Sequence, residues 1–169
     1  MERVVSATAG RFGGLDILVN NAGVGVFVSV ADMTPDQWSS TINTNLTGVY
    51  NACHVALPHL RQRGGGYIVN ISSLAGKNAF PNAAAYCASK SGLNAFSEAL
   101  MQEVRYDNIR VSYVMPGSVA TGFSGQASTG ADWKTSPDDV AEVVMDLLRS
   151  DPRSLQSRVE IRPSRPKKS

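Results

Sequence analysis

Four short apolar segments alternate along the chain with longer segments of helical periodicity. The apolar segments are DILVN from Asp16, YIVNI from Tyr67, RVSYVM from Arg110 and RVEI from Arg158. Their apolar residues are too continuous for strands that keep one face in water, which predicts buried strands of a parallel sheet. We therefore expect an α/β fold, a partial Rossmann-like, doubly wound parallel sheet with helices on both faces.

Three segments between these strands carry signals of amphipathic helices. The first covers 35–63, with Thr34 of TPDQW as the predicted N-cap and glycines at its end. The second covers 82–106, and the third follows Ser136 of the SPDD motif. In doubly wound sheets ligands bind beyond the carboxyl ends of the strands. The polar sequences NNAGVG, SSLAG and PGSVAT, which follow three of the strands, should therefore lie together at one edge.

Length and composition restrict the class of protein. The 169 residues predict one domain over 1–169, with 163–169 as a solvated basic tail. No apolar run reaches the roughly 20 residues that a membrane span needs, and no leader pattern opens the chain, so we expect a cytoplasmic protein and no membrane partner. The net charge is only +2 and the body lacks a basic stripe, which argues against a nucleic-acid partner.

Two cysteines, Cys53 and Cys87, are too few for a disulfide framework and are expected to be reduced, packed thiols. Histidines and carboxylates do not cluster at the spacing of metal ligands. We predict no metal site.

Five motifs occur in one order along the chain: NNAG at 20–23, NTNLTG at 43–48, VNISS at 69–73, YCASK at 86–90 and PGSVAT at 116–121. With them the chain resembles the short-chain dehydrogenases/reductases over nearly its whole length. The interval of 13 positions from Ser73 to Tyr86 also fits the pattern of that family. The resemblance implies an NAD(P)-dependent oxidoreductase that transfers a hydride between nicotinamide and a carbonyl or alcohol substrate.

The residue types at this site suit that chemistry. Tyr86 and Lys90 are four positions apart, so on a helix their polar tips are neighbours, either as a surface pair or as a proton-transfer unit. A carbonyl that accepts a hydride needs a proton, which a phenol can supply if a neighbouring cation lowers its pKa from about 10. We expect Tyr86 to be the general acid, Lys90 to lower its pKa, and Ser73 to hold the carbonyl oxygen by a hydrogen bond.

The resemblance implies further roles. Asn45 would bend its helix and hold a water that links Lys90 to solvent, and it completes the candidate catalytic set Ser73, Tyr86, Lys90 and Asn45. Ser72, beside Ser73, is expected to hydrogen-bond the backbone locally. Thr121 is either a contact to the nicotinamide carboxamide or a turn hydroxyl. The candidate cofactor-binding residues are Asn20, Ala22, Gly23, Tyr86, Lys90, Pro116, Gly117, Val119 and Thr121.

One family motif is missing. Relatives begin with a strand and a TGxxxGxG turn that holds the pyrophosphate, whereas Met1 to Phe12 resembles the helix before a later family strand. We therefore expect an N-terminally truncated member, in which the strand at Asp16 forms an unprotected edge. NAD cannot be distinguished from NADP as the cofactor. The alternatives are a non-catalytic chain that binds or regulates a full-length relative, and a chain that binds a dinucleotide or another small molecule weakly without catalysis.

Expected partners are a small carbonyl or alcohol substrate and further copies of the chain. The helices at 35–63 and 82–106 match those that pair in family dimers, so we expect a homo-oligomer through them, or a contact with a full-length relative. The segment 123–134, FSGQASTGADWK, has the place of the substrate lid in relatives and the glycine and serine content of a loop.

Overall fold

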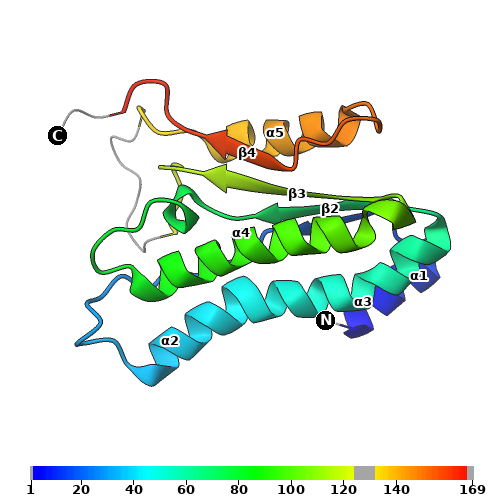
Figure 1. Cartoon of the computed structure of the whole chain (residues 1–169). Coiled ribbons are helices and arrows are strands. Elements are labelled where there is room, and N and C mark those ends of the chain that lie inside the picture. Colours follow the sequence, from blue (N-terminus) through cyan, green and yellow to red (C-terminus); the bar gives the residue numbers. More distant parts are fainter. Residues whose placement is uncertain (1, 124–131, 167–169) are drawn as a thin grey trace.

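A parallel sheet lies at the centre of the fold (Figure 1). The structure, a computed structural model, describes residues 2–123 and 132–166. Within these residues the sheet has four strands: β1 (Ile17–Asn20), β2 (Gly66–Ile71), β3 (Ile109–Pro116) and β4 (Arg158–Ile161). Neighbouring strands pair in the order β1-β2-β3-β4, and every pairing is parallel. All four predicted strands and the predicted α/β class are confirmed.

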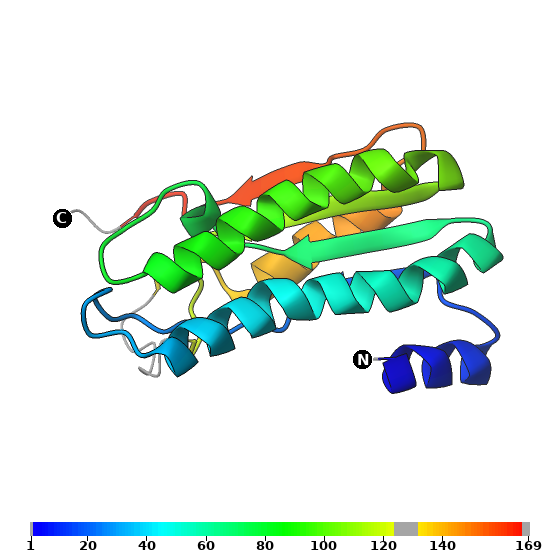
Figure 2. The same cartoon turned by 60° about the horizontal axis from the view of Figure 1, so that its bottom comes forward.

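Helices cover both faces of this sheet. They are α1 (Glu2–Phe12), α2 (Pro35–Ile42), α3 (Gly48–Arg63), α4 (Ala84–Val104) and α5 (Pro137–Arg149). Short 3-10 turns lie at Leu74–Gly76 and Arg105–Asp107. Helices α3 and α4 lie side by side on one face, and α5 covers the other (Figures 1 and 2). No helix in the described part of the chain is long and apolar enough to cross a membrane.

Side-chain caps fix the starts of two predicted helices. Thr34 accepts a hydrogen bond from the backbone N–H of Gln37 at 3.2 Å, and the Gln37 side chain accepts one from the Thr34 N–H at 2.9 Å. Ser136 and Asp139 form the same reciprocal pair at the start of α5. Such boxes satisfy N–H groups that have no partner inside the helix. Helix α4, in contrast, follows Ala83 and has no side-chain cap.

The helix predicted over 35–63 is formed, but it is not a regular α-helix throughout. A π-helical turn at Asn43–Thr47 joins α2 to α3, at the residue where the resemblance implied a bend. The cause is Asn45, whose side chain is fully buried and bonded to groups outside the helix. A π turn adds a residue to the local repeat and often occurs at functional sites.

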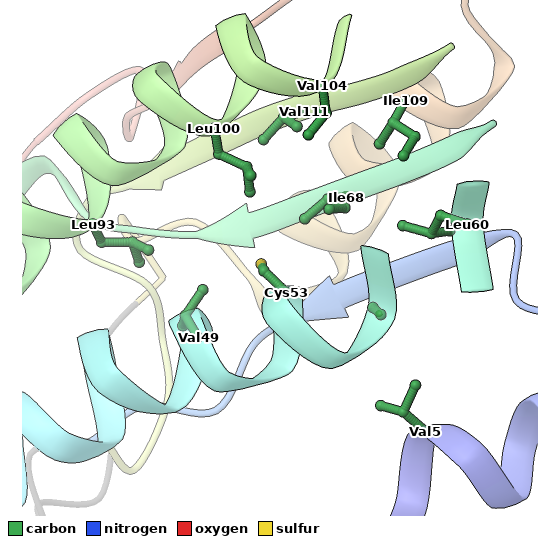
Figure 3. Close-up of a cluster of buried hydrophobic side chains, with 11 residues drawn as sticks. Val5, Val49, Cys53, Leu60, Ile68, Leu93, Leu100, Val104, Ile109 and Val111 are labelled. Atoms are coloured by element: carbon green, nitrogen blue, oxygen red, sulfur yellow. The ribbon is translucent and has the colours of Figure 1, made fainter. Parts of the chain in front are cut away.

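The larger core lies between the sheet and helices α3 and α4 (Figure 3). Its fully buried side chains include Leu60 of α3, Ile68 of β2, and Leu93 and Val104 of α4. Cys53 packs in the same cluster as a free thiol. A second, smaller cluster joins the opposite face of β2 and β3 to Leu147 of α5. The two clusters hold the strand ends in fixed positions relative to α4.

Strand β1 lies at the edge of the sheet, as predicted, but it is not buried on both faces. Leu18 packs against the core beside α3, whereas Ile17 and Val19 on the opposite face are each 44% exposed. The expectation of a covered strand is therefore wrong for β1, because α5 packs over β2, β3 and β4 instead. A salt bridge of 2.7 Å between Asp16 and Arg63 lies at the start of the strand.

Candidate active site

A cavity of about 720 Å³ opens at the carboxyl ends of β1, β2 and β3. This is the edge at which the sequence predicted a site. The cavity is lined by seven of the predicted site residues: Gly23, Ser73, Tyr86, Lys90, Pro116, Val119 and Thr121. Three loops and the start of α4 are thus brought together around one space.

Tyr86 and Lys90 lie near the start of α4, on one face of the helix. Lys90 is only 4% exposed, and its ammonium nitrogen lies 5.9 Å from the centroid of the Tyr86 ring. The same nitrogen donates a hydrogen bond to the carbonyl oxygen of Ile71, the last residue of β2, at 2.8 Å. This bond fixes the lysine between the helix and the end of the strand.

Burial governs the ionisation of this pair. It raises the pKa of the Tyr86 phenol above its ordinary 10.0, and a hydrogen bond with Ser73 opposes the rise in part. Burial also lowers the pKa of Lys90 from 10.5 to about 8. The predicted net lowering of the Tyr86 pKa is therefore wrong, because desolvation outweighs the influence that lowers this pKa. At neutral pH the phenol keeps its proton, which is the form a proton donor needs.

Ser73 follows the end of β2 and has an extended backbone. Its hydroxyl accepts a hydrogen bond from the Ala75 N–H at 3.1 Å and donates a long one to the Pro116 carbonyl at 3.5 Å. Ser72 is buried and donates to the backbone carbonyl of Lys90, and it also bonds to Asn94. The predicted bond to the backbone is present, but it is not local, because Lys90 lies 18 positions away in α4. Of the two serines, Ser73 is the one that affects the pKa of the Tyr86 phenol, which it lowers.

Asn45 lies beneath the cavity and does not line it. Its carbonyl oxygen accepts a hydrogen bond from the Val24 N–H at 2.8 Å, and its amide donates to the Val24 carbonyl at 2.8 Å and to Ser89 at 3.0 Å. The side chain therefore ties the segment after β1 to α4. Its role in holding a water for Lys90 stays a prediction.

The backbone at Gly23 passes close to this group. A Cβ atom at Gly23 would lie 3.4 Å from the Asn45 carbonyl oxygen and 3.7 Å from the Lys90 nitrogen. A side chain would extend into the space above the lysine. The glycine leaves this space open to a ligand.

Three predicted cofactor residues do not line the cavity. Asn20 donates a hydrogen bond to Asn70 at 2.8 Å, which fits the bracing role that the resemblance implied. Gly117 packs against Leu74, where an added Cβ would meet a methyl carbon at 2.3 Å. Ala22 is exposed outside the cavity wall. These three residues shape the loops rather than contact the space between them.

Thr121 lines the cavity and also accepts a hydrogen bond from the Phe123 N–H at 3.4 Å. Both interpretations of this residue are thus kept. In the segment predicted as a loop over 123–134, residues 124–131 lie outside the described residues, as do 167–169 of the predicted basic tail.

Sequence reasoning missed several side chains in the cavity wall. Phe27 and Phe123 both lie close to Gly25, and Lys134 comes from the segment before α5. A phenylalanine in the glycine-containing GVGVFV, directly after NNAG, was the available signal for Phe27. Phe123 and Lys134 are the first and last residues of the segment predicted as the substrate lid, but their individual places in the cavity wall were not predicted, because they depend on the path of a loop.

Comparisons with known proteins agree with this arrangement. The family model described as short chain dehydrogenase matches residues 1–132. The chain is 39% identical over 161 residues to a trans-4-hydroxycyclohexanecarboxylate dehydrogenase of Sinomonas cyclohexanicum, covering 90% of this chain and 60% of that protein. It is 44% identical over 109 residues to an acetoacetyl-CoA reductase of Shinella zoogloeoides, and the match covers 64% of this chain and 45% of that protein.

Solved structures show the same likeness. An alcohol dehydrogenase of Thermococcus sibiricus in complex with 5-hydroxy-NADP superposes with a TM-score of 0.89 at 25% identity, covering 99% of this chain and 72% of that one. A metagenomic short-chain oxidoreductase in complex with NADP gives a TM-score of 0.82 at 37% identity, and the match covers 96% of this chain and 68% of that one. The chain therefore spans about half to three-quarters of the length of these similar proteins.

Proposed function

Because the chain belongs to the short-chain dehydrogenase family, we propose that it is an NAD(P)-dependent oxidoreductase that transfers a hydride between nicotinamide and a carbonyl or alcohol substrate. The observation that supports this most strongly is the meeting of Ser73, Tyr86 and Lys90 in the wall of one cavity. The two relatives named above act on a cyclohexanecarboxylate and on an acyl-CoA, so the comparisons leave the substrate class open.

In the proposed mechanism Tyr86 donates its phenolic proton to the oxygen of the substrate carbonyl. Ser73 donates a hydrogen bond to the same oxygen and holds it at the phenol. The phenolate that results is stabilised by Lys90, whose ammonium nitrogen lies 5.9 Å from the centroid of the Tyr86 ring. In the direction of alcohol oxidation the same residues act in reverse, with Tyr86 as the base.

The residues present fit the nicotinamide end of a dinucleotide. Gly23 leaves space above Lys90, and Val119 and Thr121 form the opposite wall. When bound, the nicotinamide supplies the hydride. The sequence contains no TGxxxGxG motif, so among the residues of this chain the phosphates have Lys134, in the same cavity wall, as a candidate contact. NADP is favoured over NAD on the ground that several similar structures hold NADP.

Titration of the purified chain with NADPH and NADH tests the proposal. We expect the nicotinamide fluorescence to change saturably with the concentration of cofactor. In Lys90→Met the affinity for the cofactor should fall about tenfold or more, because a hydrogen bond from a charged group is lost. Lys77→Met is the matched control, since Lys77 is an exposed lysine paired with Glu160 outside the cavity. A soluble, folded chain without binding or turnover would contradict the proposal.

That outcome would favour the second candidate function, a non-catalytic chain that binds a full-length relative. The exposed edge of β1 supports this alternative, since an unpaired strand edge offers backbone groups to another chain.

We also propose a homo-oligomer through α2, α3 and α4. Tyr50 of α3 is 50% exposed. Its ring centroid lies 5.7 Å from that of His54, on which it stacks, and 6.5 Å from that of Phe96 in α4. This face of the helices therefore presents an aromatic surface. Sedimentation velocity should show an oligomer that Tyr50→Glu dissociates. Tyr106→Glu, at an exposed tyrosine on the 3-10 turn after α4, should leave it intact. A wild-type monomer would contradict the proposal.

A further inference from the structure

Aromatic rings from separate segments converge on one side of Tyr86. The centroid of Phe27 lies 5.7 Å from that of Tyr86, with 66° between the ring planes. The ring centroid of Phe123 lies 5.6 Å from that of Tyr86, with 55° between the ring planes. Phe80 stacks on Phe27 with 6.2 Å between the centroids and 26° between the planes. These geometries match favourable edge-to-face and offset arrangements of aromatic pairs.

The three phenylalanines are exposed although each lies against another aromatic ring. Phe27 and Phe123 are each 41% exposed and Phe80 is 47% exposed. Phe27 and Phe123 line the cavity, whereas Phe80 supports Phe27 from behind. A cluster of exposed rings at a cavity indicates a surface that a hydrophobic ligand covers.

Gly25 allows the two cavity rings to come this close. A Cβ atom at this position would lie 2.7 Å from a ring carbon of Phe123 and 2.9 Å from one of Phe27. Any side chain at position 25 would push the rings apart. The separation of these two walls is therefore set by a residue that does not touch the catalytic groups.

The charges around the cavity restrict the ligand further. Among the described residues that line it, the charged side chains are Lys90 and Lys134, and none is a carboxylate. The Lys90 ammonium already donates to the Ile71 carbonyl. The cavity suits a neutral or anionic compound and disfavours a cationic one.

From these contacts we propose that Phe27 and Phe123, supported by Phe80, form a substrate subsite that prefers carbonyl groups and alcohols carried on a hydrophobic ring. The proposal rests on the proposed function, because it places the substrate carbonyl at Tyr86. The two phenylalanines in the cavity wall provide apolar contacts for a flat or alicyclic ring. A linear chain of the same carbon number loses rotational freedom when it is held there, whereas a ring has little to lose.

The test compares 1-tetralone with 2-decanone, which are matched in carbon number, by saturation-transfer NMR on the purified chain. We expect 1-tetralone to bind about 3- to 10-fold more tightly, the range that one aromatic contact provides. In Phe27→Leu the affinities for the two ketones should become equal. Gly25→Ala should make the preference for 1-tetralone smaller, because the added methyl group displaces the rings. Phe12→Leu, at an exposed phenylalanine of α1 outside the cavity wall, is the matched control and should preserve it.

Equal binding of the two ketones, no binding of either, or an unchanged ratio in a Phe27→Leu chain with wild-type circular dichroism would overturn the proposal. Turnover with NADPH is measured separately. A ring preference without turnover contradicts the proposed function but not the aromatic subsite. Turnover without a ring preference contradicts the subsite alone.

Discussion

Tyr86→Phe is expected to lower kcat for carbonyl reduction by about 10²- to 10⁴-fold, the contribution typical of a positioned general acid. The substitution removes the hydroxyl and leaves the ring, so the contacts of Tyr86 with Phe27 and Phe123 are kept. The measurement is the rate at which NADPH is consumed with a saturating ketone. The affinity for NADPH, from fluorescence titration, should change little.

Tyr106→Phe provides the matched control for this prediction. Tyr106 is 91% exposed on the turn after α4, and loss of its hydroxyl should leave kcat unchanged. Comparable turnover in Tyr86→Phe and the wild type would show that another group supplies the proton, and the mechanism proposed for Ser73, Tyr86 and Lys90 would then be wrong.

Asn45→Ala is expected to lower the free energy of unfolding by about 3 to 5 kcal/mol. The change leaves the N–H and the carbonyl of Val24 without their partners and creates a cavity beside Ser89. Each unsatisfied buried group costs about 1–3 kcal/mol, and a large-to-small change in a core costs about 2–5 kcal/mol. The lower part of both ranges applies here, because Val24 is partly exposed. Chemical denaturation followed by circular dichroism gives the value.

Asn43→Ala is the control, because Asn43 belongs to the same π-helical turn but its side chain is exposed. We expect a change below about 0.5 kcal/mol for it, as for most surface substitutions. Hydrogen exchange at the Val24 amide should also become faster in Asn45→Ala. If the two variants have equal stability, the bonds of Asn45 do not hold the segment after β1 in place.

Local signals were enough to predict most of the fold. The apolar runs gave the strands, and Thr34 and Ser136 gave the starts of two helices, because a cap depends on residues three positions apart. The interruption at Asn45 depends on partners 21 and 44 positions away, which no helical periodicity reveals.

The candidate site divides in the same way. Tyr86 and Lys90 were predicted together from their helical spacing, and Ser73 from its place after a strand. The direction in which the Tyr86 pKa shifts was predicted wrongly, because it depends mainly on burial, which the helical spacing of two residues does not reveal. The convergence of Phe27 and Phe123 was also missed, since it joins loops that are 96 positions apart in the sequence (123 − 27 = 96).

The uncapped start of α4 affects the chemistry of Tyr86. Tyr86 is the third residue of this helix, and no side chain caps the free backbone N–H groups of the first turn. Aligned peptide dipoles give the amino-terminal end of a helix a positive potential equivalent to about half an elementary charge, and helical side chains point back towards that end. The backbone of α4 therefore favours the ionised form of Tyr86 and opposes the effect of burial. Part of the positive field that the proposed reaction needs would then come from backbone peptide groups, and it would persist at pH values where Lys90 has lost its charge.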